Sequence, residues 1–141
     1  MASALNFTNA PFMTLSGMTS GNTTTTTNYT ILPSSTSHRR LYALGVSTSD
    51  NAVNNVQFSL YDGTTTMVVA KLPISISAGT STTTAIYDVL GSSLMYGVVR
   101  ERDNTGASFL HIPSGCTVVA QYQSVLSAGE FINFTMVGQL Y

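Results

Sequence analysis

The sequence predicts an all-β protein, an antiparallel jelly-roll-like β-sandwich of about eight strands that follows an extended N-terminal arm. Along residues 39–141, apolar and polar residues alternate with the period of a half-buried strand. Turn residues separate these runs at short intervals, and no run has a helical apolar stripe of useful length. These observations divide the chain into an arm, residues 1–38, and a β-sandwich domain, residues 39–141.

The predicted arm differs from the rest of the chain in composition. Short apolar pieces lie between turn-forming residues, and five consecutive threonines occupy positions 23–27. Threonine is branched at Cβ, which favours extended backbone over helix. Ordering an extended segment costs about 1 kcal/mol per residue in backbone entropy, and contacts with other groups must offset this cost. We therefore expect the arm to lie against neighbouring subunits. The alternative is that the arm is a flexible linker. The residues expected to bind such a partner are Phe7, Phe12, Met13, Leu15, Tyr29, Ile31 and Leu32.

Strand patterns begin directly after the arm. The first covers residues 41–46, and the second covers residues 55–60, where apolar side chains alternate with amide and hydroxyl side chains. The third pattern, residues 67–76, contains Lys71 and Pro73. Because proline cannot donate to a strand ladder, we expect Pro73 to mark an edge strand or a bend.

Two short runs follow, residues 85–90 and 94–100, on either side of a Gly-Ser-Ser turn. The next segment, residues 100–103, reads Arg-Glu-Arg-Asp and precedes Asn-Thr-Gly. Charged side chains are rarely buried, and Asn and Gly favour turns. We therefore expect residues 100–103 to form an exposed turn.

The last third of the chain is the most regular, with runs at residues 108–112, 116–126 and 130–140 joined by turns that contain glycine. We expect the last two runs to form a hairpin. In the final run, alternate residues point to opposite faces, with Ile132 and Phe134 on one of them. Both faces are partly apolar, which predicts that one packs on the core and the other on a neighbouring sheet or subunit.

The composition excludes some classes of partner. Charged residues make up 8% of the chain, and five Lys and Arg against six Asp and Glu give a formal net charge of −1. The chain therefore lacks a basic surface for phosphates, and we exclude nucleic acid. Hydroxyl groups supply most of the polarity, with 21 threonines and 18 serines. A nearly neutral surface repels copies of itself only weakly, which favours a permanent place in an assembly.

Cys116 is the only cysteine, so an intrachain disulfide is impossible. The first fifteen residues do not combine a basic segment with a continuous apolar core, and so do not resemble a secretory signal. No run reaches the roughly 18 apolar residues that a membrane span needs. We therefore expect a soluble protein that is made in a cytoplasm and has no membrane partner.

Groups for catalysis are few, because four Asp, two Glu, two His and one Lys are scattered on expected turns and strands. The spacing of His38 and His111 matches no metal-ligand pattern, and His111 lies in an expected strand, where a structural histidine is the simpler interpretation. No base is adjacent to Cys116, and nucleophile-elbow and phosphate-loop motifs do not occur. We predict no catalytic residues, no metal site and no cofactor.

Several motifs within residues 53–141 are similar to those of a known family. They are a D-x-x-G turn at residues 103–106, the segment Phe-Leu-His-Ile-Pro-Ser-Gly at 109–115, and a Ser-Ala-Gly-Glu turn at 127–130 that leads into the last strand. The segment Leu-Pro-Ile at 72–74, followed by Ala-Gly, is similar too. The chain resembles the small β-sandwich head decoration proteins, or cement proteins, of tailed bacteriophages.

The resemblance implies a non-enzymatic virion protein on the outer capsid surface, which clamps adjacent subunits of the major capsid protein and itself forms a trimer or dimer. It supplies no catalytic residues and does not extend to the arm. The alternative is a receptor- or glycan-binding module of a phage tail fibre or head spike, which would use the loops at residues 61–66, 79–84 and 101–106. A metal enzyme on the same fold would need clustered ligands, which the sequence lacks.

Overall fold

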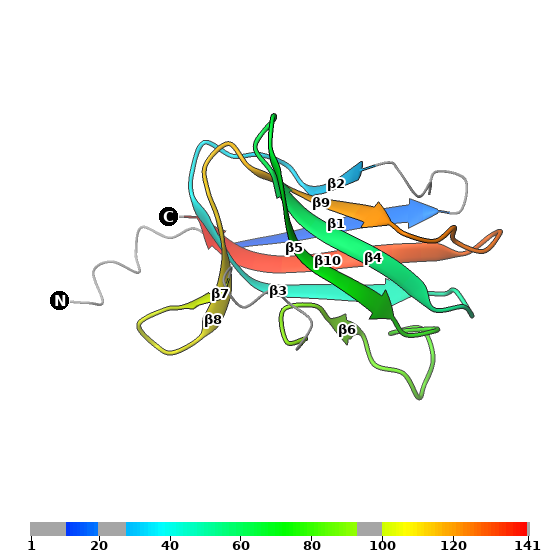
Figure 1. The fold of residues 1–141 in the computed structure, drawn as a ribbon. Helices are drawn as coiled ribbons and strands as arrows, with labels where there is room; N and C mark the ends of the chain where they lie inside the picture. The colour runs from blue at the N-terminus through cyan, green and yellow to red at the C-terminus, as the bar shows by residue number, and fades with distance from the viewer. Residues whose placement is uncertain (1–10, 20–27, 93–99, 141) are drawn as a thin grey trace.

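Two antiparallel β-sheets lie face to face in the computed structural model, which describes residues 11–19, 28–92 and 100–140 (Figure 1). Each sheet covers the apolar face of the other, which is the arrangement that the alternating sequence requires. The ten strands are β1 (Pro11–Thr19), β2 (Asn28–Leu32), β3 (Arg39–Thr48), β4 (Asn54–Tyr61), β5 (Thr66–Ile74), β6 (Tyr87–Asp88), β7 (Arg100–Arg102), β8 (Ser108–Ile112), β9 (Thr117–Tyr122) and β10 (Phe131–Leu140).

The order of the strands is that of a jelly roll. The six-stranded sheet has the order β1-β10-β3-β8-β7, with β6 also paired to β3, and the four-stranded sheet has the order β2-β9-β4-β5. Strands pair from the two ends of the chain inward, β1 with β10, β2 with β9 and β3 with β8. The chain is thus a long antiparallel ribbon rolled into two sheets. The predicted fold class is confirmed.

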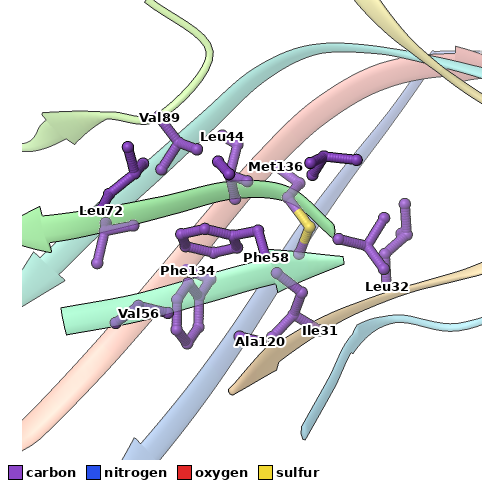
Figure 2. Packing of buried hydrophobic residues seen from close by; sticks show 14 of the residues in the cluster. Ile31, Leu32, Leu44, Val56, Phe58, Leu72, Val89, Ala120, Phe134 and Met136 are labelled. Atoms are coloured by element: carbon purple, nitrogen blue, oxygen red, sulfur yellow. The ribbon is translucent and has the colours of Figure 1, made fainter. Parts of the chain in front are cut away.

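The hydrophobic core lies between the two sheets. Along β10, Ile132, Phe134 and Met136 are fully buried, while the residues between them are half-buried or exposed. Phe134 meets Phe58 of β4 edge to face, with ring centroids 5.8 Å apart, so side chains from both sheets interlock (Figure 2). The alternation predicted for the last run is confirmed, and the face with Ile132 and Phe134 is the buried one.

The strand patterns predicted directly after residue 39 are present as β3, β4 and β5. Pro73 lies in β5, which is an edge of the four-stranded sheet, where its missing N–H leaves no ladder bond unmade. Of the run at residues 85–90, only Tyr87–Asp88 pairs, as β6. The run at residues 94–100 falls largely outside the described residues.

Two strands come from the segment that we predicted to be an arm, and the boundary at residue 38 is corrected for them. β1 pairs with β10 along its whole length, and β2 pairs with β9. Ile31 and Leu32 of β2 belong to the core and are 1% and 4% exposed. The physical reason is that the backbone of β1 and β2 completes the ladders of β10 and β9, while the apolar residues of β2 fill the core.

Two local predictions are also corrected. β9 and β10 do not form a hairpin, because β9 pairs with β2 and β4 whereas β10 pairs with β1 and β3 in the other sheet. The connection between them therefore crosses from one sheet to the other. Residues 100–102 are not part of a turn but form the exposed strand β7, paired with β8, and the turn begins at Asp103.

A buried carboxylate joins the loops at one end of the sandwich. Asp50 follows β3 and has no exposed surface. Its Oδ1 accepts hydrogen bonds from Ser127 Oγ (2.7 Å) and the Ala52 amide (3.0 Å), and its Oδ2 accepts one from the Ser127 amide (3.0 Å). Its carbonyl oxygen accepts a hydrogen bond from the Ser77 amide (2.8 Å). One residue thus holds together the connections that follow β3, β5 and β9.

A buried guanidinium has the same role at the start of β3. Arg39 is 4% exposed, and it donates from Nη1 to the carbonyl oxygen of Pro33 (2.6 Å) and from Nη2 to that of Cys116 (2.7 Å). Burial lowers the pKa of Arg39, and the charge of a Cys116 thiolate acts in the opposite direction. These bonds join the β2–β3 connection to the β8–β9 connection.

We predict that the Asp50 carboxylate stabilises the fold at neutral pH and that acid removes this contribution. Burial alone would raise the pKa of Asp50, but hydrogen bonds from Ser127 and Ala52 outweigh burial and lower it. A carboxyl whose pKa is lower in the folded state stabilises the fold above its unfolded pKa, about 3.9. The contribution therefore decreases as the pH falls below about 4, through the folded-state pKa.

In Asp50→Asn, the Ser127 amide and hydroxyl lose their carboxylate acceptor, and the free energy of unfolding at neutral pH should fall by about 2 kcal/mol. The variant should also lose less stability than the wild type between about pH 5 and pH 2. Urea denaturation followed by circular dichroism measures both effects. The exposed Glu101→Gln is the control and should change stability by less than about 0.5 kcal/mol. Equal stability of Asp50→Asn and Glu101→Gln would contradict the stabilising role of the Asp50 carboxylate.

Candidate functional site

An open, polar hollow lies on the outer face of the six-stranded sheet, where β3 and β10 meet the β7–β8 turn. Its volume is about 420 Å³. Of the three loops predicted to bind a glycan, residues 101–106 contribute to it, whereas residues 61–66 and 79–84 do not. The residues that line the hollow are Arg40, Tyr42, Asp103, Asn104, Thr105 and Gln139.

Asp103 begins the β7–β8 turn and holds its shape. Its Oδ1 accepts hydrogen bonds from the amides of Thr105 (2.9 Å) and Ala107 (3.0 Å) and from Thr105 Oγ1 (2.7 Å). Its Oδ2 accepts a hydrogen bond from the Tyr42 hydroxyl (2.9 Å), which ties the turn to β3. Gly106 has a φ of 87°, a conformation that glycine adopts without strain. The D-x-x-G motif of the sequence is therefore a turn built around one carboxylate.

These hydrogen bonds favour the ionised form of Asp103. The Thr105 hydroxyl has the largest effect; with the Tyr42 hydroxyl and the two amides, it outweighs desolvation and lowers the pKa of Asp103 to about 2. Asp103 is thus ionised at neutral pH, and most of its acceptor capacity is used within the protein. A general base needs a pKa near the working pH, so this carboxylate is suited to orienting polar groups rather than to proton transfer.

Arg40, which lines the hollow, lies over an aromatic ring. Its guanidinium carbon is 5.0 Å from the ring centroid of Phe109, which is 4% exposed although it lies outside the core cluster. The Tyr42 ring packs on the same phenylalanine, with centroids 5.8 Å apart. Burial, and then the hydrogen bond to Asp103, raise the pKa of Tyr42, while Arg40 lowers it. The guanidinium and the phenol are therefore held in place by contacts with Phe109.

The hollow offers hydrogen-bonding groups of several kinds and no activated nucleophile. Arg40 supplies a cation, Tyr42 and Thr105 supply hydroxyl groups, and Asn104 and Gln139 supply amides. Such groups can bind the hydroxyl groups of a polar ligand in a defined orientation.

The structure brings the two histidines together, which their separation in the sequence did not reveal. The rings of His38, in the β2–β3 connection, and His111, in β8, have centroids 5.3 Å apart. Cys116 is partly buried against the core. Burial, and then the charge of Asp62, raise the pKa of its thiol, while Arg39 lowers it. The Cys116 thiol is therefore protonated at neutral pH.

Within residues 11–19, 28–92 and 100–140, no three side chains of His, Cys, Asp or Glu are placed to hold a metal ion together. No helix in these same segments is both long and apolar enough to cross a membrane.

The residues predicted to bind a partner are placed in different parts of the molecule. Ile31 and Leu32 are core residues, so the prediction that they contact a partner is corrected: the opposite sheet already covers them. Tyr29 is partly buried against the core. The others lie in β1 (Phe12, Met13 and Leu15) or outside the described residues (Phe7).

We predict that Tyr42→Phe raises the pKa of Asp103 from about 2 toward its ordinary value of 3.8. The pKa should stay below 3.8 because Thr105 still donates two hydrogen bonds. An NMR titration of the carboxyl carbon measures this shift. Tyr61→Phe removes a hydroxyl that donates to Gly63 and should leave the pKa of Asp103 unchanged. If Asp103 had the same pKa in both variants, the Tyr42 hydroxyl would not be one of the groups that lower it.

No protein-family model matches this chain, and no curated protein sequence is similar enough to match it.

Proposed function

We propose that this chain is a non-enzymatic structural protein of a bacteriophage particle. It acts as a decoration protein that binds the outer surface of the head and stabilises contacts between subunits of the major capsid protein. The jelly roll supports the proposal, because this fold presents two broad sheet faces and recurs in viral capsid proteins. The protein would be made in the host cytoplasm and function on the virion.

The outer face of the four-stranded sheet is the observation that carries this proposal. One row across it reads Asn28, Gln121, Gln57 and Lys71. In the neighbouring row, Thr30 is exposed and Val68 is half-buried, whereas Ser59 and Val119 between them are buried. Lys71 is the only charged residue among the outward positions of β2, β9, β4 and β5. The accessible part of this face therefore consists almost entirely of amide, hydroxyl and small apolar groups.

Such a face is suited to permanent contact with another protein. Charged side chains are costly to bury and are depleted at the centre of interfaces, whereas amide and hydroxyl groups can exchange bonds with water for bonds with a partner. Each contact is small, but the symmetry of a shell repeats it many times. Copies that bridge a seam between capsid subunits would thus raise the temperature at which the shell opens.

We predict that a charge on this face weakens attachment to the capsid. Thr30 is exposed in β2, so Thr30→Glu should preserve the fold and bury an unpaired charge in the interface, which should lower binding by more than about tenfold. Thr83→Glu is the matched control, because Thr83 is exposed in the loop that connects β5 to β6. Co-sedimentation of the purified chain with capsids that lack it measures binding, and calorimetry of the particles measures stabilisation.

The expected result is that wild type and Thr83→Glu bind and raise the opening temperature of the shell, whereas Thr30→Glu does neither. Equal binding of all three chains would exclude this face as the contact. Failure of the wild type to bind capsids would overturn the proposed function.

The hollow beside β3 supports a second candidate function, the binding of a glycan on a host surface by a tail-fibre or head-spike module. Its lining of hydroxyl, amide and charged groups is typical of sites that bind sugar hydroxyls. Arg40 is held in place over Phe109, which reduces the entropy lost when a ligand binds.

For this second candidate, we predict that the wild type binds a subset of oligosaccharides on a glycan array. Arg40→Gln should reduce that binding by about tenfold or more, because the guanidinium is lost from the wall of the hollow. Arg102→Gln is the matched control, since Arg102 is exposed and its Nη1 donates to Gly106 outside the hollow. No binding to the array, or equal binding by the two variants, would exclude the hollow as a glycan site.

A further inference from the structure

The edges of the two sheets differ in how well they are protected against pairing with another strand. β7 has three residues, all charged and exposed. β5 contains Lys71 and Pro73, and its pairing with β4 has a register shift. β2 has five residues and a register shift in its pairing with β9. Short length, charge, proline and bulges all protect an edge, so three of the edges have at least one such device.

β1 has none of these devices after its first residue. It has nine residues and carries no charge, and its pairing with β10 has no register shift from Pro11 to Thr19. Within the part of the chain that the structure describes, β1 pairs only with β10, while β2 of the other sheet lies beside it without pairing. Every second residue of such a strand directs its N–H and C=O away from the sheet. β1 is therefore a regular, uncharged template for one more strand.

The surroundings of β1 indicate that this strand comes from a second copy of the chain. The outward residues of β10 next to it are Asn133, Thr135 and Val137, so the neighbouring sheet face is uncharged as well. Two copies that approach through this edge bring neutral surface to neutral surface, and a net charge of −1 opposes the approach only weakly. An antiparallel strand is also complementary to itself about a twofold axis.

We propose that two copies pair β1 with β1, antiparallel, about a twofold axis at Leu15, the middle residue of the strand. The six-stranded sheets of the two copies then form one continuous sheet. Leu15 of each copy lies opposite Leu15 of the other, and Met13 lies opposite Gly17. This pairing does not depend on attachment to a capsid and uses a different surface from the four-stranded face.

A hollow on the outer sheet face lies next to the β1 edge. It has a volume of about 380 Å³ and lies over β1, β10 and β3, and its lining carries no charged residue. Ser16 and Gly17 form its β1 side. The surface beside the β1 edge is therefore uncharged, which is compatible with the approach of a second copy.

A cysteine scan tests the register directly. In a Cys116→Ser background, Leu15→Cys places two thiols opposite each other on the twofold axis, within the Cα separation that a disulfide requires. Mild oxidation should therefore yield at least about ten times more covalent dimer than for the control Thr66→Cys, at the exposed start of the edge strand β5. Non-reducing electrophoresis measures the yield. Equal yields from Leu15→Cys and Thr66→Cys would overturn the proposal.

A charge substitution provides the second test, with circular dichroism to confirm that each variant is folded. Sedimentation equilibrium should show a concentration-dependent dimer for the wild type and for Thr66→Lys, and a reduced dimer fraction for Leu15→Lys. A wild type that stays monomeric at all concentrations would overturn the pairing. The same monomeric result is expected if another segment of the same chain covers β1, so that arrangement would overturn the proposal as well. Capsid binding by Thr30→Glu is measured separately, so failure of this pairing and failure of the proposed function are distinguishable.

Discussion

A buried ion at each end of β3 determines how the loops of the sandwich are arranged. At the start of the strand, the carbonyl oxygens of Pro33 and Cys116 enclose the guanidinium of Arg39. Just beyond its end, the carboxylate of Asp50 accepts hydrogen bonds from Ser127 and its neighbours. A buried ion is destabilising unless its hydrogen bonds are made, so each ion restricts the surrounding loops to the arrangement that makes them. The sheets supply the core, and these ions connect loops that are distant in the sequence.

The scarcity of charge has different consequences on different surfaces. Around the β7–β8 turn, Arg40 and Asp103 lie beside the same hollow, and the hydroxyl of Tyr42 connects the turn to β3. The outer face of the four-stranded sheet carries a single lysine, and the β1 edge carries no charge. A polar ligand, a protein surface and a second strand would therefore meet separate regions of the molecule. This separation allows attachment to a shell, self-association and ligand binding to be tested independently.

Only part of the hollow could be predicted from the sequence. The turn at residues 103–106 was visible, because Asp, Asn and Gly favour a local conformation that depends on few distant contacts. Arg40, Tyr42 and Gln139 reach the hollow through strand pairing, and no local pattern distinguishes them from other polar residues on exposed faces. The contact between the two histidine rings was missed for the same reason.

The sequence by itself determined that the chain forms strands, that the residues of the last run alternate between two faces, and that Pro73 marks an edge or a bend, because alternation and proline chemistry act over a few residues. The tertiary structure decided that the face with Ile132 and Phe134 is the buried one. Only the tertiary structure decided which strands pair. β9 and β10 are consecutive but lie in different sheets, whereas β1 and β10 are far apart in the chain but pair along nine residues. The threonine-rich composition of the N-terminal segment did not identify β1 and β2 as part of the sandwich. They become strands of it because their pairing partners, β10 and β9, and the core residues that they contact are distant in the sequence.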